Sequence, residues 1–202
     1  MKQAYTKQTT VFISIIMSLA MLPVIASDKH DDDDDDDAVS AMAEISGCTD
    51  AGISGIALLT ERPSSEGVKV VDVVVKVNGM TPGKHAVHIH ETAACEPCSA
   101  AQGHFDPGPN SNTNPDGNHP FHMGDLINID VGANGKGKMK TKTSRITLSP
   151  GPLSVFDADG SAFIIHDFED TYCPEGVAAG CAGGSRAACG IIVPVSGDDS
   201  DD

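Results

Sequence analysis

The apolar residues between Val39 and Val195 fall into short runs that do not follow a helical period. Several runs alternate apolar with polar residues or are rich in valine and isoleucine, which is typical of strands with one face on a core. Turn-forming residues separate the runs, and Asn134-Gly135 indicates a hairpin between two of them. No amphipathic helix of any length is evident, so the pattern predicts an all-β sandwich or barrel. The expected strands include residues 55–61, 69–77, 84–91, 123–131, 138–148, 162–166 and 188–195.

Two long segments interrupt this pattern. Residues 91–121 and 167–187 are rich in turn-forming residues and show no strand alternation. Long ordered loops in a compact domain are usually functional. Many of the histidines and cysteines lie in or beside these segments, so the sequence predicts a β scaffold whose two long loops carry its chemistry.

The first 26 residues have the features of a secretory signal peptide. Lys2 and Lys7 precede an apolar run over residues 11–22, and Val24-Ile25-Ala26 provides a small-residue cleavage site. The apolar run is short for a membrane span, and polar residues follow it closely. We therefore expect a secreted or periplasmic protein without membrane attachment after cleavage; a retained N-terminal anchor is the alternative.

The chain is strongly acidic, with a formal net charge of -16 that becomes -18 once Lys2 and Lys7 are removed. Such a charge opposes binding to nucleic acid or to anionic membranes. Much of it lies in residues 27–38 and 196–202, two aspartate-rich segments that we expect to be disordered because like charges repel. A metal-attracting role for the aspartate run is the alternative. The predicted folded domain is residues 39–195.

The six cysteines are an even number, which in a secreted chain favours disulfides over free thiols. One pair has CxxC spacing, but no βαβ unit surrounds it, so a thioredoxin-like redox role is weakly indicated. Six cysteines allow fifteen pairings, and spacing alone does not choose among them. They are Cys48, Cys95, Cys98, Cys173, Cys181 and Cys189.

The histidines form the strongest chemical pattern in the chain. His88 and His90 are two residues apart, so on a strand both point to the same face. His119, His122 and Asp125 recur every three residues in a segment that must curl. Imidazole nitrogens with one carboxylate suit copper and zinc better than calcium or magnesium. Each motif alone has an ordinary structural explanation, but together with His104 and His166 they indicate a metalloprotein.

Five segments, in order, resemble the motifs of secreted, bacterial-type copper–zinc superoxide dismutases. Residues 83–91 resemble the copper-binding strand and residues 103–107 the segment around the histidine that bridges the two metals. The last zinc ligands, the final copper histidine, and the active-site arginine with its disulfide cysteine match residues 122–126, 165–167 and 184–190. The resemblance covers about residues 41–195 and implies an eight-stranded Greek-key sandwich or flattened barrel with two long metal-bearing loops.

The resemblance also implies roles for individual residues. Copper would be held by His88, His90, His104 and His166. Zinc would be held by His104, His122 and Asp125. Asp170 would link a copper histidine to a zinc histidine, and His85 would help to close the site without binding metal. The family usually has a second zinc histidine about eight residues after the bridging one, where this chain has Asn112. His119 is the only spare candidate: it either completes the zinc site or faces solvent.

The disulfides follow in part from the same resemblance. Cys98 lies six residues before His104, as the loop-anchoring cysteine of the family does, and is expected to pair with Cys189. Cys173 and Cys181 are eight residues apart in one loop and would form a local disulfide. Cys48 and Cys95 would then pair by elimination.

The implied activity is dismutation of superoxide to dioxygen and hydrogen peroxide by alternating Cu(II) and Cu(I), with zinc in a structural or electrostatic role. His104 would act catalytically by releasing copper and carrying a proton, and Arg186 by attracting the anion. The local field of Arg186 would have to overcome the acidic net charge, which focusing in a cleft can achieve. The alternative is a non-enzymatic copper-binding or buffering protein on the same scaffold. The sequence leaves monomer and homodimer open.

Overall fold

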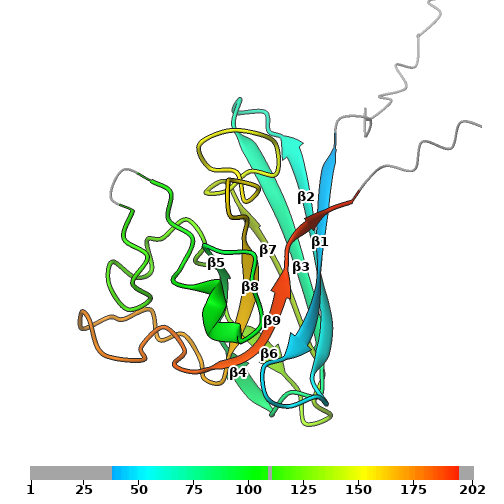
Figure 1. Cartoon of the computed structure of the whole chain (residues 1–202), viewed down its shortest axis with the longest axis vertical. Helices are drawn as coiled ribbons and strands as arrows, with labels where there is room; N and C mark the ends of the chain where they lie inside the picture. Colours follow the sequence, from blue (N-terminus) through cyan, green and yellow to red (C-terminus); the bar gives the residue numbers. More distant parts are fainter. Residues whose placement is uncertain (1–37, 109–110, 196–202) are drawn as a thin grey trace, which may run out of the picture. The chain divides into compact units, whose positions relative to one another are not determined.

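The computed structural model describes residues 38–108 and 111–195; the predicted signal peptide, the acidic segment before residue 38 and the tail from residue 196 lie outside them. The described chain is almost entirely β-structure and loop (Figure 1). Its helical structure is one short 3₁₀ turn, Cys98–Ala101, and no helix in the described ranges could cross a membrane. The strands are β1 Val39–Gly47, β2 Ser54–Pro63, β3 Lys69–Asn78, β4 Gly83–His85, β5 Val87–His90, β6 Ile129–Val131, β7 Gly137–Thr143, β8 Ala162–His166, β9 Arg186–Ile191 and β10 Val193–Pro194.

The strands pair antiparallel in the order β4-β6-β7-β3-β2-β1-β9-β8-β5, with β10 on β1. The two ends of this order, β4 and β5, are consecutive in the chain and separated only by Ala86. The sheet therefore curls into a nearly closed barrel. One residue likewise separates β9 from β10, namely Ile192. If each of these two pairs is counted as one strand, the ten segments make eight strands. The predicted all-β, eight-stranded class is confirmed.

The core comes from the alternation seen in the sequence. In β3 the residues Val71, Val73 and Val75 are fully buried, while their neighbours along the strand are less buried. β5 and β8 differ, because every one of their residues is buried. Both faces of these two strands are thus covered. On β5 this includes the face that carries His88 and His90, which is buried as well.

The predicted strand over residues 123–131 was too long, since only Ile129–Val131 pairs as β6. Backbone carbonyls in and just before this segment bind a side chain instead: the Arg145 guanidinium donates to the oxygens of Pro120, His122 and Asp125 at 3.1, 3.0 and 2.8 Å, respectively. A segment whose carbonyls bind one side chain cannot form a regular ladder. The predicted Asn134-Gly135 hairpin does form, with Gly135 at φ 73° between β6 and β7.

Glu61, in β2, is a buried carboxylate whose hydrogen-bond donors include residues more than 80 positions later in the chain. It accepts hydrogen bonds from the backbone N–H groups of Leu148 and Ser149 at 2.5 and 3.0 Å and from the Ser149 hydroxyl at 2.6 Å. Lys69 lies 3.1 Å away. Burial raises the pKa of Glu61, but these hydrogen bonds outweigh it and the pKa lies below its usual 4.5. The carboxylate thus fastens the segment after β7 to the barrel.

Glu61→Gln should therefore lower the free energy of unfolding by about 1–3 kcal/mol near neutral pH, because an amide cannot accept all these bonds. A carboxylate with a lowered folded-state pKa stabilises the protein above its unfolded pKa and loses this effect as the pH falls. The difference between wild type and variant should consequently shrink below about pH 4.5. Urea unfolding from pH 3 to 7 measures it, with the exposed Glu66→Gln as control. Equal unfolding free energies at pH 7 would contradict this role.

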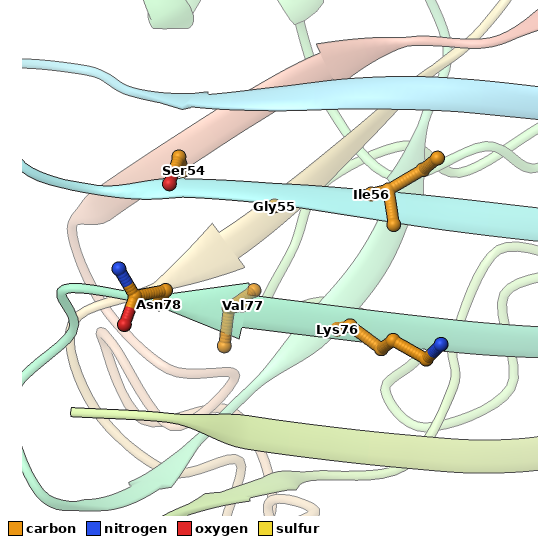
Figure 2. A pocket seen from close by; sticks show the side chains of 6 residues that line it. All are labelled: Ser54, Gly55, Ile56, Lys76, Val77 and Asn78. Atoms are coloured by element: carbon orange, nitrogen blue, oxygen red, sulfur yellow. The ribbon is translucent and has the colours of Figure 1, made fainter. Parts of the chain in front are cut away.

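A shallow hollow lies on β2 and β3 near the end of the barrel where Gly55 faces Val77 (Figure 2). Figure 2 shows Ile56 on β2 and Lys76 on β3, among the residues that line the hollow. The remaining lining residues are Ser54 and Asn78. This lining contains no imidazole, thiol or carboxylate, so the hollow lacks the side chains that bind copper or zinc.

Candidate metal centre

The centre is built around β5, whose alternation sends Val87 and Ile89 into the core and His88 and His90 to the opposite face. The first long loop lies against this strand: Phe105 N–H donates to Ile89 O, and Ile89 N–H donates to Gly124 O, both at 2.9 Å. Gly124 permits this approach, because a Cβ there would lie 2.2 Å from Ile89 O. These contacts bring His104 and Asp125 beside β5, where they bridge to His90 and His88, respectively.

Four buried histidines form the first cluster. Donor nitrogens of all four lie within 4.8 Å of one another. His90 Nδ1 lies 2.9 Å from Gln102 O and His166 Nδ1 lies 3.0 Å from Gly184 O. A carbonyl only accepts, so each Nδ1 carries the proton and each Nε2 keeps a free lone pair. The members are His88, His90, His104 and His166.

The inward nitrogens of this cluster lack ordinary partners. His90 Nε2 and His104 Nε2 are buried and have no hydrogen bond among the described residues. His88 Nδ1 faces His166 Nε2 at 3.2 Å. Buried polar atoms without partners are costly, and lone pairs that converge in this way fit a metal ion that accepts them.

A second cluster converges on the Asp125 carboxylate. The Nδ1 atoms of His104, His119 and His122 lie 2.7, 3.1 and 3.0 Å from its oxygens. His119 Nδ1 is buried without a well-aligned hydrogen bond, and His122 Nε2 is 2.7 Å from Gly117 O. Donor atoms of His88, His104, His119 and Asp125 lie within 4.8 Å of one another, and His122, which is outside this group, has its Nδ1 3.3 Å from His104 Nδ1. Three imidazoles and a carboxylate suit tetrahedral zinc.

His104 belongs to both clusters. Its Nδ1 lies 2.7 Å from Asp125 Oδ1 in the second cluster, and its Nε2 is buried without a hydrogen-bond partner among the described residues. Its ring is 4.2 Å from that of His88 and 4.9 Å from that of His122, measured between centroids. One imidazole thus separates two adjacent groups of donors.

Asp170 joins the outer sides of the two clusters, at 3.1 Å from His88 Nε2 and 2.7 Å from His119 Nε2. Asn128 holds it in place by accepting from Asp170 N–H at 2.8 Å and donating to Asp170 O at 2.9 Å. Sequence reasoning missed Asn128, and also Arg145 behind the second cluster, because no spacing rule links either residue to the histidines. His85 does not face the clusters: its nitrogens lie 2.8 Å from His166 O and Thr81 O.

The two clusters differ in charge. Burial, with the neighbouring His104, lowers the pKa of His88 to about 3, and burial lowers the pKa of His166 to about 4. In the second cluster burial opposes the charge, but bonds to Asp125 and Asp170 raise the pKa of His119 to about 9. The pKa values of both aspartates stay well below the usual range through the same contacts, despite burial. Neutral imidazoles and ionised carboxylates are the forms that bind metals, so His119 must release a proton when it binds one.

Arg186 stands at the opening of the first cluster. Its guanidinium donates to Cys98 O at 2.5 Å and to Gln102 O, which fixes its position. It lines a hollow of about 300 Å³ together with His166. We call this the entrance hollow; its other lining residues are Pro115, Asp116, Gly180, Ala182 and Gly184. Burial lowers the pKa of Arg186 from its usual value. An arginine beside a buried histidine cluster favours the approach of an anion.

The disulfides correct two predictions. Cys98 pairs with Cys48, and Cys95 pairs with Cys189, so the expected Cys98–Cys189 and Cys48–Cys95 bonds were wrong. The predicted Cys173–Cys181 bond is confirmed. The four other cysteines gather at one place, since Ser46 pairs with Cys189 between β1 and β9 and Cys48 N–H donates to Ala187 O. Cys98 is the first residue of the 3₁₀ turn, and Cys95 lies before that turn.

Non-reducing peptide mapping should therefore recover Cys48 linked to Cys98 and Cys95 linked to Cys189. Removing the first bond in a Cys48→Ala, Cys98→Ala double variant should cost about 2–5 kcal/mol of unfolding free energy. The second bond should persist in that variant. A peptide that links Cys98 to Cys189 in the oxidised wild type would contradict this pairing.

A family model described as copper/zinc superoxide dismutase matches residues 53–192. The chain belongs to the copper/zinc superoxide dismutase family. A superoxide dismutase of Deinococcus radiodurans is 36% identical over 151 residues, covering 68% of this chain and 76% of that protein. An extracellular superoxide dismutase of Onchocerca volvulus is 33% identical over 151 residues, covering 71% of each.

A solved structure, a double mutant of a SOD-like protein from Bacillus subtilis, matches with a TM-score of 0.56 at 28% identity. The match covers 74% of this chain and 95% of that one. Copper and zinc are the metals of the superoxide dismutase family, and the protein is accordingly an oxidoreductase that acts on superoxide. The two buried clusters of donors agree with two such metals.

Proposed function

We propose that the protein is a secreted superoxide dismutase that holds copper at His88, His90, His104 and His166 and zinc at His104, His119, His122 and Asp125. The observation that carries this assignment is that His104 belongs to both clusters of donors. Its Nδ1 contacts Asp125, and its Nε2 is buried without a hydrogen-bond partner among the described residues, which leaves a lone pair for a metal.

Bound copper would supply a one-electron couple, Cu(II)/Cu(I), that oxidises one superoxide to dioxygen and reduces a second to hydrogen peroxide. The protein's own contribution is to fix the imidazoles through Gln102, Gly184 and Asp170. His104 Nε2 is the atom that would take up a proton and deliver it to the reduced product, since its Nδ1 side is held by Asp125. Zinc would have no redox role and would order the second cluster.

Arg186 would attract superoxide and orient it beside His166. The net charge of -16 repels an anion at long range, so a local positive field must dominate at the opening. The guanidinium is held by two carbonyls, which leaves its charge uncompensated by a carboxylate among its described contacts. His85 would support His166 through the backbone oxygen to which it is bonded.

Three disulfides, and no free cysteine among the described residues, support an oxidising compartment outside the cytoplasm. The similarity to an extracellular relative supports the same location. We propose that the chain acts outside the cytoplasm or in a periplasm after loss of residues 1–26, with superoxide as its partner and no binding to nucleic acid or membrane.

Superoxide consumption by the protein loaded with copper and zinc tests the function, with the metal-free protein as control. Copper-dependent consumption is expected. The SOD-like relative shows that this scaffold occurs in a protein not described simply as a dismutase, and fold alone does not establish activity. Stoichiometric copper binding without superoxide consumption would favour the second candidate, a non-enzymatic copper-binding or buffering protein.

A further inference from the structure

Asp116 connects the two long loops across the entrance hollow. It belongs to the first loop, yet its carboxylate accepts from the backbone N–H of Gly180 at 2.9 Å and of Ala182 at 3.2 Å, both in the second loop. Figure 1 shows these loops side by side on one flank of the barrel. Cys173 and Cys181 also lie near Asp116, but they form a disulfide and offer no thiolate to a metal.

The segment that Asp116 holds leads directly to the metal centre. Ala182 is buried and forms an antiparallel bridge with Asp170. Thr171 N–H donates to Cys181 O at 3.0 Å, which adds a second connection beside that bridge. Because Asp170 contacts both His88 and His119, displacement of residues 180–182 would reach the outer side of both clusters.

The same carboxylate lines the entrance hollow with His166 and Arg186. A negative charge at this position opposes the attraction that Arg186 exerts on an anion. The second loop provides no lysine to compensate, since residues 167–187 contain none. The Asp116 carboxylate therefore holds the two loops together but weakens the positive field at the entrance hollow.

We propose that Asp116 is a positioning residue of the dismutase: its carboxylate holds residues 180–182 against the first loop, and its charge weakens anion attraction at the entrance hollow. The effect of Asp116 on superoxide attraction rests on the proposed function. The positioning itself concerns only residues of this chain and can be measured without turnover.

Amide hydrogen exchange and azide binding on Asp116→Ala and Asp116→Asn test the proposal in the copper- and zinc-loaded protein. Asp116→Ala should accelerate exchange at Gly180 and Ala182 by about tenfold or more, because both amides lose their acceptor. Unchanged exchange at Val73 and Val75 shows that the barrel is folded. Asp116→Asn keeps one of the two oxygen acceptors and no charge, so one of the two amides should exchange more slowly than in the alanine variant. The same variant should bind azide about three- to tenfold more tightly than wild type.

Asp50→Asn is the matched control, because Asp50 also accepts a backbone N–H, from Gly52, but lies outside the entrance hollow. It should leave both measurements unchanged. Wild-type exchange at Gly180 and Ala182 in Asp116→Ala would overturn the positioning role. Unaltered azide affinity in Asp116→Asn would overturn the electrostatic one. Repeating the exchange on metal-free protein separates these results from any failure of the proposed dismutase activity.

Discussion

His166→Ala is expected to reduce superoxide consumption to the uncatalysed background while the barrel remains folded. His166 is the last residue of β8, and its Nε2 lies 3.2 Å from His88 Nδ1 in the first cluster. Gly184 O holds the other nitrogen at 3.0 Å, so the ring has one orientation and one inward lone pair. In His166→Ala the proposed copper site would keep only three imidazoles and would lose the imidazole that lies beside Arg186.

The fold should tolerate this change because His166 follows the regular part of its ladder. The β8–β9 register shifts between Ile165 and His166, and the core side chains before it stay in place. Copper content, superoxide consumption and the melting temperature would be measured together. His30→Ala, a histidine outside the described residues, is the control and should behave as wild type. Wild-type turnover by a folded His166→Ala protein would refute the copper assignment.

His119→Ala is expected to deplete zinc while copper is largely retained. His119 Nδ1 lies 3.1 Å from Asp125, and its Nε2 lies 2.7 Å from Asp170. The variant thus loses a donor from the second cluster and a partner of Asp170, whereas His88, His90 and His166 keep their contacts. A bound metal stabilises the folded state by mass action, and each tenfold weakening of zinc binding would lower that stability by about 1.4 kcal/mol.

Elemental analysis after exhaustive dialysis, with melting temperatures of metal-loaded and metal-free protein, measures this effect. The melting temperature should fall in both forms, because both lose the contacts of His119 with Asp125 and Asp170. It should fall further in the loaded form, which also loses the stabilisation by zinc. Full zinc retention in His119→Ala would show that His119 is a bystander. The zinc site would then consist of His104, His122 and Asp125 with a ligand other than histidine.

Strand positions were predictable because local alternation reports burial on a pleated strand. The valines of β3, the Asn134-Gly135 turn and the His88/His90 pair all depend on residues one or two apart. The prediction was wrong over residues 123–128, where Arg145 binds the backbone carbonyl of Asp125 from a position 20 residues later. Such a contact leaves no periodic trace in either segment.

The sequence by itself determined the all-β class, the two long loops, the shared face of His88 and His90 and the number of cysteines available for disulfides, since each depends on residue type and local spacing. The grouping of the other histidines followed from the family resemblance. Only the tertiary structure decided the cysteine pairing, the contact of His119 with both aspartates, and the supporting positions of Asn128, Arg145 and Asp116. The physical reason is the same in each case. A side chain that reaches across the barrel or between loops is selected by distance in space, and antiparallel closure brings together residues whose separation along the chain carries no information about that distance.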